Sequence, residues 1–64
     1  MEKLSILVSQ SIHDAGIEKM FLKYCEVYCG WLPGSEVDEQ SFKTCLRNFM
    51  SENPIFTHFI EVKD

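Results

Sequence analysis

The chain has 64 residues, of which 45% are hydrophobic and 25% charged, a balance typical of one small folded domain rather than a disordered segment. Ten acidic residues against six basic ones give a formal net charge of −4, which opposes non-specific attraction to nucleic acid or to an anionic membrane. No apolar run approaches the ~20 residues of a transmembrane helix, and the first residues lack the pattern of a signal peptide. We therefore expect one cytoplasmic domain over residues 1–64, with a protein as its partner and no membrane.

The first segment, residues 3–8 (KLSILV), is a short run of aliphatic side chains, and we expect a strand there. Ser11 and Asp14 follow with the spacing of a helix-capping box, in which side-chain oxygens accept hydrogen bonds from the free amides of the first turn. This spacing predicts a helix from Ile12 to Cys29. A helix that runs continuously from residue 3 is the alternative.

The stretch Ile17–Trp31 is apolar around more than half of the circumference of that helix, at ~100° per residue. One face carries Ile17, Met20, Phe21, Tyr24, Val27, Tyr28 and Trp31, and Leu22, Cys25 and Cys29 extend it. A helix this apolar lies in the centre of its own fold or offers its surplus surface to a partner. A second copy of the chain, in a homodimer, is one such partner.

Residues 30–34 (GWLPG) predict a loop, because proline disfavours helix in the residue before it and glycine permits turns. Ser35 and Asp38 then repeat the capping spacing and predict a second helix from Val37 to Ser51. Its apolar stripe has the ordinary width of a surface helix. The stripe consists of Phe42, Cys45, Leu46, Phe49 and Met50.

Asn53 and Pro54 end this helix, and residues 55–62 (IFTHFIEV) are rich in the β-branched and aromatic side chains that favour a strand. Pairing with residues 3–8 would give a two-stranded sheet. The expected fold is therefore a small α+β domain of order β-α-α-β with two central helices. A mostly helical, winged-helix-like domain is the alternative.

The residues that could take part in catalysis form no recognisable catalytic or nucleotide-binding motif, so we expect no enzyme and no cofactor. His13 and His58 lack a partner that would make either a catalytic base. The cysteines are odd in number, which favours free, packed thiols. Together with His58, these three thiols have the residue types of a Cys3His zinc site, so a small zinc-binding module is a third alternative. The cysteines are Cys25, Cys29 and Cys45.

A winged-helix-like DNA-binding accessory protein, with a replication or regulatory role, is the main alternative function. Its contacts would come from one polar face of the second helix, made of Gln40, Lys43, Thr44 and Arg47. The segment from Phe21-x-x-Tyr24-Cys25 through Phe42-x-x-x-Leu46 resembles the winged-helix tails of viral and mobile-element helicase-primases. That resemblance implies a DNA-binding second helix. The chain departs from the pattern where this helix begins, because acidic side chains there repel phosphates.

The function that the sequence favours is a non-enzymatic protein-binding module that acts stoichiometrically. Tyr28, Trp31 and Leu32 are the expected anchors, since aromatic residues concentrate at the centres of interfaces. Glu36, Asp38 and Glu39 are expected to steer a partner with a basic surface. A small acidic chain of this kind is similar to the phage and mobile-element inhibitors that block host nucleic-acid-handling or defence proteins, including anti-CRISPR proteins.

Overall fold

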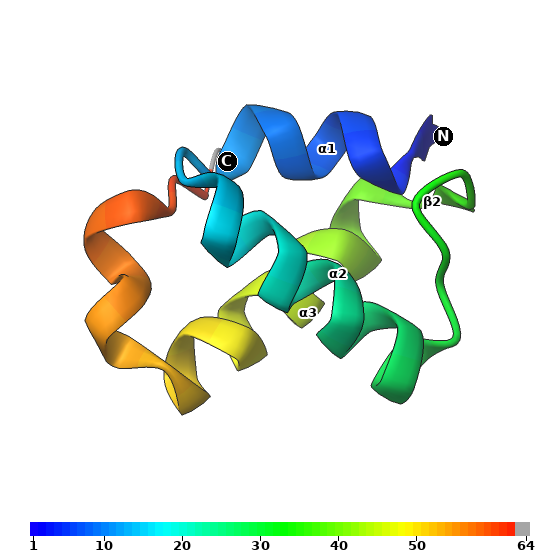
Figure 1. The fold of residues 1–64 in the computed structure, drawn as a ribbon. Coiled ribbons are helices and arrows are strands. Elements are labelled where there is room, and N and C mark those ends of the chain that lie inside the picture. The colour runs from blue at the N-terminus through cyan, green and yellow to red at the C-terminus, as the bar shows by residue number, and fades with distance from the viewer. Residues whose placement is uncertain (63–64) are drawn as a thin grey trace.

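The computed structural model describes residues 1–62 and contains three α-helices, one 3-10 helix and a two-stranded antiparallel sheet (Figure 1). In chain order the elements are β1 (Glu2–Lys3), α1 (Leu4–Ser11), α2 (Ala15–Cys29), β2 (Glu36–Val37), α3 (Glu39–Glu52) and the 3-10 helix η1 (Pro54–Phe59). Helices dominate, and one small sheet accompanies them. The expected α+β fold class is confirmed.

The first segment is helical, so the strand expected over residues 3–8 is wrong. Its buried side chains are Leu4, Leu7, Val8 and Ser11, which recur at the spacing of one helix face. That face packs against both α2 and α3. The alternative of a helix continuous from residue 3 into α2 is also wrong. Ile12 leaves the helix with extended dihedral angles of φ −112° and ψ 124°.

The sheet joins different residues from those expected. Glu2 pairs with Val37 and Lys3 with Glu36, so the partner of the N-terminal strand lies just before α3. The C-terminal segment forms η1 instead of a strand. An isolated bridge between Ile12 and Ile60, and a contact of 3.5 Å between His13 Nε2 and a Glu61 carboxylate oxygen, connect the C-terminal segment to the N-terminal third of the chain. Proline in the first turn of η1 fits a helical start, because its fixed φ angle is already helical.

Both long helices begin two to three residues later than expected, because the aspartates and not the serines cap them. The carboxylate of Asp14 accepts a hydrogen bond from the amide three residues on at 3.0 Å. Asp38 does the same for the second and third amides after it, at 3.0 and 3.2 Å. Ser11 lies buried in the last turn of α1, and Ser35 accepts a hydrogen bond within its own loop.

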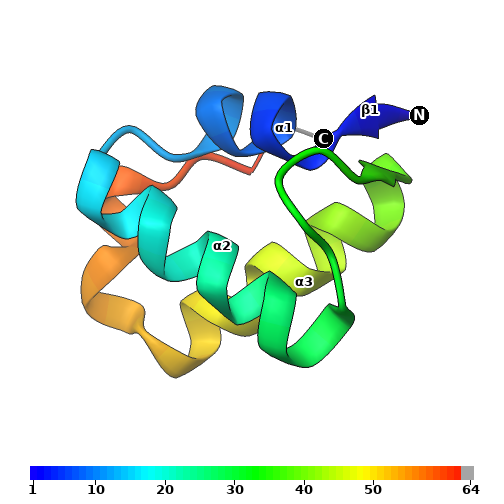
Figure 2. The ribbon, with the colours of Figure 1, turned by 45° about the vertical axis from the view of Figure 1, so that its right-hand side comes forward.

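Phe21 lies at the centre of the core. Its ring meets Phe42 at 5.7 Å and Phe49 at 5.2 Å between centroids, both edge to face, so α2 and α3 join through aromatic side chains. Figure 2 shows α1 above this pair and α2 crossing in front of α3. The buried apolar residues are Leu4, Leu7, Val8, Ile12, Ile17, Phe21, Cys25, Val37, Phe42, Cys45, Leu46, Phe49 and Ile60.

The apolar excess of α2 divides into a buried part and an exposed part. Ile17, Phe21 and Cys25 form the buried stripe. Leu22 and Tyr24 pack at its edges and are partly buried. Among the other apolar side chains of the helix, Met20, Val27, Tyr28 and Cys29 are exposed. The fold therefore covers α2 on one side and leaves apolar surface near its C-terminal end.

Candidate functional site

An open groove of about 420 Å³ lies between the C-terminal end of α2 and the flank of α3. Aromatic side chains come from α2 and the loop after it, small polar side chains come from α3, and two cysteines lie between them. The lining residues are Tyr24, Tyr28, Cys29, Trp31, Ser41, Thr44, Cys45 and Asn48. We call this surface the aromatic groove.

Packing anchors one side of the groove and leaves its other aromatic residues accessible. The Tyr24 ring contacts Phe49 at 5.4 Å and Tyr28 at 4.7 Å between centroids, which ties it to the core. Tyr28 itself is 71% exposed. Trp31 is half-buried, and its backbone amide donates to the carbonyl of Cys25 at 3.2 Å. The Tyr28 ring is thus both held and open to a ligand.

The turn that places Trp31 in the groove depends on Gly30. This residue ends α2 with φ 70° and ψ 19°, the left-handed conformation that glycine adopts without steric cost. No heavy atom outside its immediate neighbours lies within 4 Å of a Cβ built on Gly30, so backbone conformation and not space favours glycine. The chain then turns back, and Trp31 reaches α3 instead of continuing along the axis of α2.

Carboxylates flank the groove at both ends. At one end the Tyr24 hydroxyl donates a hydrogen bond to Glu52 at 2.9 Å, and this bond raises the pKa of Tyr24 to about 12, with burial and the Glu52 charge adding to it. At the other end Asp38 accepts from the amide of Ser41, which lines the groove. None of the described lining residues is cationic. The groove therefore presents aromatic faces between two negative charges.

The thiols of Cys29 and Cys45 lie in contact in the groove, with their sulfur atoms 3.5 Å apart. The sulfur of Cys25 lies 3.9 Å from that of Cys45 on the core side. Burial of the sulfur and its hydrogen bond with Cys45 raise the pKa of Cys29 to about 11. The hydrogen bond with Cys25, followed by burial, raises the pKa of Cys45. Thiols with raised pKa values are protonated at neutral pH, which is the opposite of what a nucleophilic cysteine needs.

The three cysteines are free, but they do not join His58 in a metal site. Within residues 1–62, no three or more histidine, cysteine or acidic side chains are arranged to hold a metal ion. His58 lies exposed in η1. The two closest thiol pairs are thus contacts between α2 and α3.

The predicted anchor residues lie at one end of α2, whereas the three predicted acidic residues have different surroundings. Tyr28 and Trp31 line the groove, and Leu32 is exposed in the loop beyond it. Of the acidic residues, Glu36 lies in β2 opposite Lys3, and Asp38 uses its carboxylate to cap α3. Glu39 turns toward α1 and lines another hollow.

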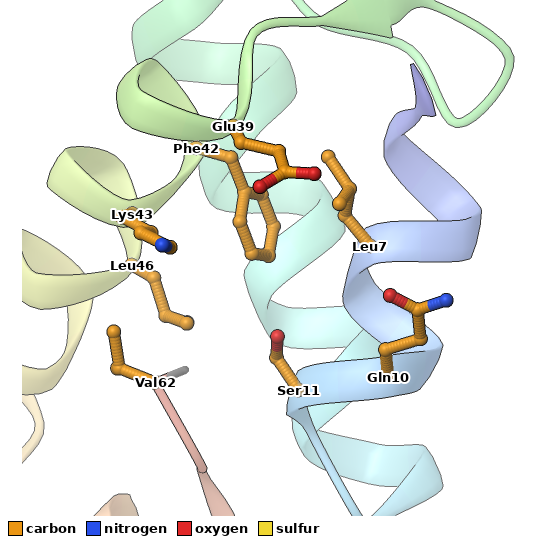
Figure 3. A pocket seen from close by; sticks show the side chains of 8 residues that line it. All are labelled: Leu7, Gln10, Ser11, Glu39, Phe42, Lys43, Leu46 and Val62. Carbon is orange, nitrogen blue, oxygen red and sulfur yellow. The ribbon is translucent and has the colours of Figure 1, made fainter. Parts of the chain in front are cut away.

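This second hollow, of about 200 Å³, lies between α1 and α3 (Figure 3). Leu7 and Ser11 approach it from α1, and Phe42 and Leu46 approach from α3, with Val62 at one end. Its polar rim is formed by Gln10, Ser11, Glu39 and Lys43. In the described chain, every buried side-chain nitrogen and oxygen has a hydrogen-bond partner, so no fully buried polar atom of the hollow is left unpaired.

The residues predicted for DNA contact lie on the sector of α3 between the two hollows, where Thr44 lines the aromatic groove. Gln40, Thr44 and Arg47 are exposed, and the Thr44 hydroxyl donates to the carbonyl of Gln40 at 3.0 Å. Lys43 is half-buried at the rim of the second hollow, which it shares with Glu39. The element after α3 is a 3-10 helix and not the strand that a wing would need.

Sequence reasoning named Thr44 only for DNA contact and did not predict the α3 side of the groove. Ser41, Thr44 and Asn48 have the spacing i, i+3, i+7 and share one helix flank, a signal that the sequence contains. Tyr24 and Tyr28 of α2, with Trp31 in the loop after it, have the similar spacing i, i+4, i+7. What the spacing does not reveal is that these two flanks face each other, because that depends on how α2 and α3 cross.

Within residues 1–62, no helix is both long and apolar enough to cross a membrane. Comparison with family models, curated proteins and solved structures finds no match to this chain. The geometry and charge of the aromatic groove therefore form the basis of the functional proposal.

Proposed function

We propose that this protein is a non-enzymatic protein-binding module whose aromatic groove receives a basic segment of a partner protein. The observation that supports this proposal is an open groove with accessible aromatic faces and with two carboxylates hydrogen-bonded to residues of its lining. Tyr28 and Trp31 supply accessible aromatic surface, and Asp38 and Glu52 flank it. The carboxylates favour a positively charged occupant over a neutral one.

An arginine or lysine side chain fits this chemistry in two ways. A cation over the face of a tryptophan or tyrosine gains roughly 0.5 to 2 kcal/mol from the charge distribution of the ring. The formal net charge of −4 also steers a basic partner toward the chain. The same charge disfavours a second copy of this chain as the occupant, because two acidic copies repel each other. We therefore commit to a basic partner rather than to a homodimer.

Binding rather than catalysis is supported by the state of the thiols. Cys29 and Cys45 are the nucleophilic side chains of the groove, and both have raised pKa values. We propose a stoichiometric action in the cytoplasm, in which the module covers a basic surface of a host nucleic-acid-handling or defence protein. An inhibitor of phage or mobile-element type acts in this way by occupying the surface that nucleic acid would otherwise bind.

The test uses a fluorescently labelled arginine-rich peptide as the probe and fluorescence anisotropy as the measurement. We expect Tyr28→Ala and Trp31→Ala each to weaken binding about tenfold or more, which corresponds to ~1.4 kcal/mol or more. Ile55→Ala is the matched control. It removes an apolar side chain that is 75% exposed in η1, outside the groove, and should leave affinity unchanged.

A second comparison separates local recognition from general attraction between charges. Glu52→Gln removes a carboxylate at the groove, and Glu2→Gln removes an exposed one in β1. We expect the first substitution to weaken peptide binding more than the second. Equal effects of the two substitutions, or equal binding by the Trp31→Ala variant and the native protein, would overturn the proposed site.

Two further results would assign the surface to a different partner. The first is a molar mass in sedimentation that rises with protein concentration. If the Trp31→Ala variant keeps the mass of a monomer under the same conditions, the groove would be assigned to self-association. Salt-sensitive binding of duplex DNA that is lost when Lys43→Glu and Arg47→Glu are combined would favour the nucleic-acid alternative. Either result would overturn the proposal of a basic protein partner.

A further inference from the structure

We infer that Cys29 and Cys45 form an oxidisable dithiol, a modification site that closes into a disulfide on reaction with a hydroperoxide. The two sulfur atoms come from different helices and are 3.5 Å apart. A disulfide bond requires about 2.05 Å, so the sulfurs need to approach by roughly 1.5 Å. This pair already lies in contact, so side-chain rotation with a small shift of one helix end brings the atoms together.

The positions of the two cysteines favour this closure. Cys29 is the last residue of α2, and the left-handed Gly30 and an irregular loop follow it, so the helix holds Cys29 from one side only. Cys45 lies in the middle of α3 and is held by the core. Closure therefore requires less rearrangement at Cys29 than at Cys45.

Exposure decides which thiol reacts first. Cys29 is exposed, whereas Cys45 is 5% exposed and Cys25 is fully covered. A hydroperoxide from solvent therefore reaches Cys29 before the other two. Cys45 lies closest to it and acts as the resolving thiol, and Cys25 lies behind Cys45 at 3.9 Å. The order of reaction follows from the decreasing exposure of the three thiols.

The chemistry balances with the hydroperoxide as the oxidant. Because the pKa of Cys29 is raised to about 11, the reaction proceeds through the fraction of its thiol that is deprotonated at alkaline pH. That deprotonated sulfur attacks the terminal oxygen, the O–O bond breaks, and the oxyanion released takes up a proton to leave as an alcohol, or as water where the oxidant is hydrogen peroxide. Cys29 becomes a sulfenic acid. The sulfur of Cys45, on losing its proton, attacks the sulfur of Cys29, so that the S–S bond forms, the S–O bond breaks and water leaves. Two thiols are oxidised, and one hydroperoxide is reduced.

The disulfide ties the end of α2 to α3 within the aromatic groove, beside Trp31. Its effect on a bound basic segment rests on the proposed function, because the closure draws together the two sides between which that segment would lie. The modification itself does not depend on that function. Oxidation of the isolated protein therefore tests the disulfide whether or not the basic peptide binds.

The experiment treats the native protein with hydrogen peroxide at alkaline pH, where part of the Cys29 thiol is deprotonated, and follows its intact mass and its non-reduced peptide map. We expect a loss of two hydrogen masses, one linkage joining Cys29 to Cys45, and quenching of the fluorescence of Trp31, the single tryptophan of the chain. A phosphine reductant should reverse all three changes. Cys29→Ser should abolish the loss of mass, and Cys25→Ala should retain it, since Cys25 takes no part.

Three outcomes would overturn the inference. The first is a stable gain of oxygen on Cys29 without a cross-link. The second is a linkage between two copies of the chain, and the third is a linkage that involves Cys25. Because Cys29 is exposed, its replacement by serine tests the inference without disturbing the core. Circular dichroism of each variant before oxidation establishes that the thiols being compared belong to folded chains.

Discussion

Closure of the Cys29–Cys45 disulfide should stabilise the folded protein, and the size of the effect follows from the positions of the two residues. They are separated by 16 positions in the chain, so the bond closes a loop of moderate length in the unfolded state. The entropy lost by the unfolded chain on closing such a loop corresponds to about 3 kcal/mol at 25 °C. Drawing the sulfurs together costs part of this gain, so about 3 kcal/mol is the upper limit.

This stabilisation is large for a domain of this size. A 64-residue chain has an unfolding free energy of about 3 to 10 kcal/mol at the usual value per residue. A gain of 3 kcal/mol would raise the melting temperature by roughly 12 to 24 °C, at 4 to 8 °C per kcal/mol. The expected shift is therefore well outside the error of a thermal melt.

The assay is a thermal melt followed by circular dichroism, on peroxide-treated protein before and after reduction by a phosphine. The reductant should remove the shift in the native protein, and Cys29→Ser should show no shift in either state. A disulfide present by mass with an unchanged or lower melting temperature would refute the reasoning. It would mean that closure distorts the contact between α2 and α3 by as much as it restrains the unfolded chain.

Three further predictions concern the fold and the groove. Asp38→Ala should lower the unfolding free energy by about 1 kcal/mol in urea titrations, because two amides of α3 lose their acceptor. A larger loss of unfolding free energy for Ser35→Ala would show that the serine caps α3. Phe21→Ala should lower the free energy of unfolding by about 3 to 5 kcal/mol, because it empties the centre of the aromatic cluster. The variant should show little helical circular dichroism signal at 37 °C. A cooperative melt near that of the native protein would contradict the central position of Phe21. Tyr24 should ionise near pH 12 in an ultraviolet titration and at lower pH after Glu52→Gln, since their hydrogen bond is the largest cause of the raised pKa. Because this folded-state pKa lies above the usual value of 10, the stabilisation from the bond is present below pH 10 and disappears as the pH rises through about 12; an unshifted pKa in the native protein would show that the bond does not form.

The two long helices were predictable because their signals are local. An apolar side chain every three to four residues predicts a helix, and aspartates with free amides ahead of them supply the caps. The predicted start points were early only because serine and aspartate both cap helices. That α2 leaves apolar surface exposed was also predictable, since its apolar side chains exceed what one helix face buries, and Tyr28 is 71% exposed.

The two short segments at the chain ends were not predictable in the same way. Residues 4–11 and 54–59 are rich in side chains that favour strands, yet both form helices. In α1 the helix places Leu4, Leu7 and Val8 on one face against α2 and α3, a burial that a strand of the same length would divide between two faces. Tertiary packing outweighs a propensity that differs by only ~1 kcal/mol between residue types.

By itself the sequence determined an acidic α+β domain with two capped helices, and it showed that α2 carries more apolar surface than one face can bury. Only the tertiary structure decided how that surface divides, because the crossing of α2 and α3 buries Cys25 and leaves Tyr28 exposed. The same crossing placed Cys29 against Cys45 and opened the aromatic groove between the helices. Periodicity is a property of neighbours along the chain, whereas a contact between helices depends on the packing angle at which their side chains interlock.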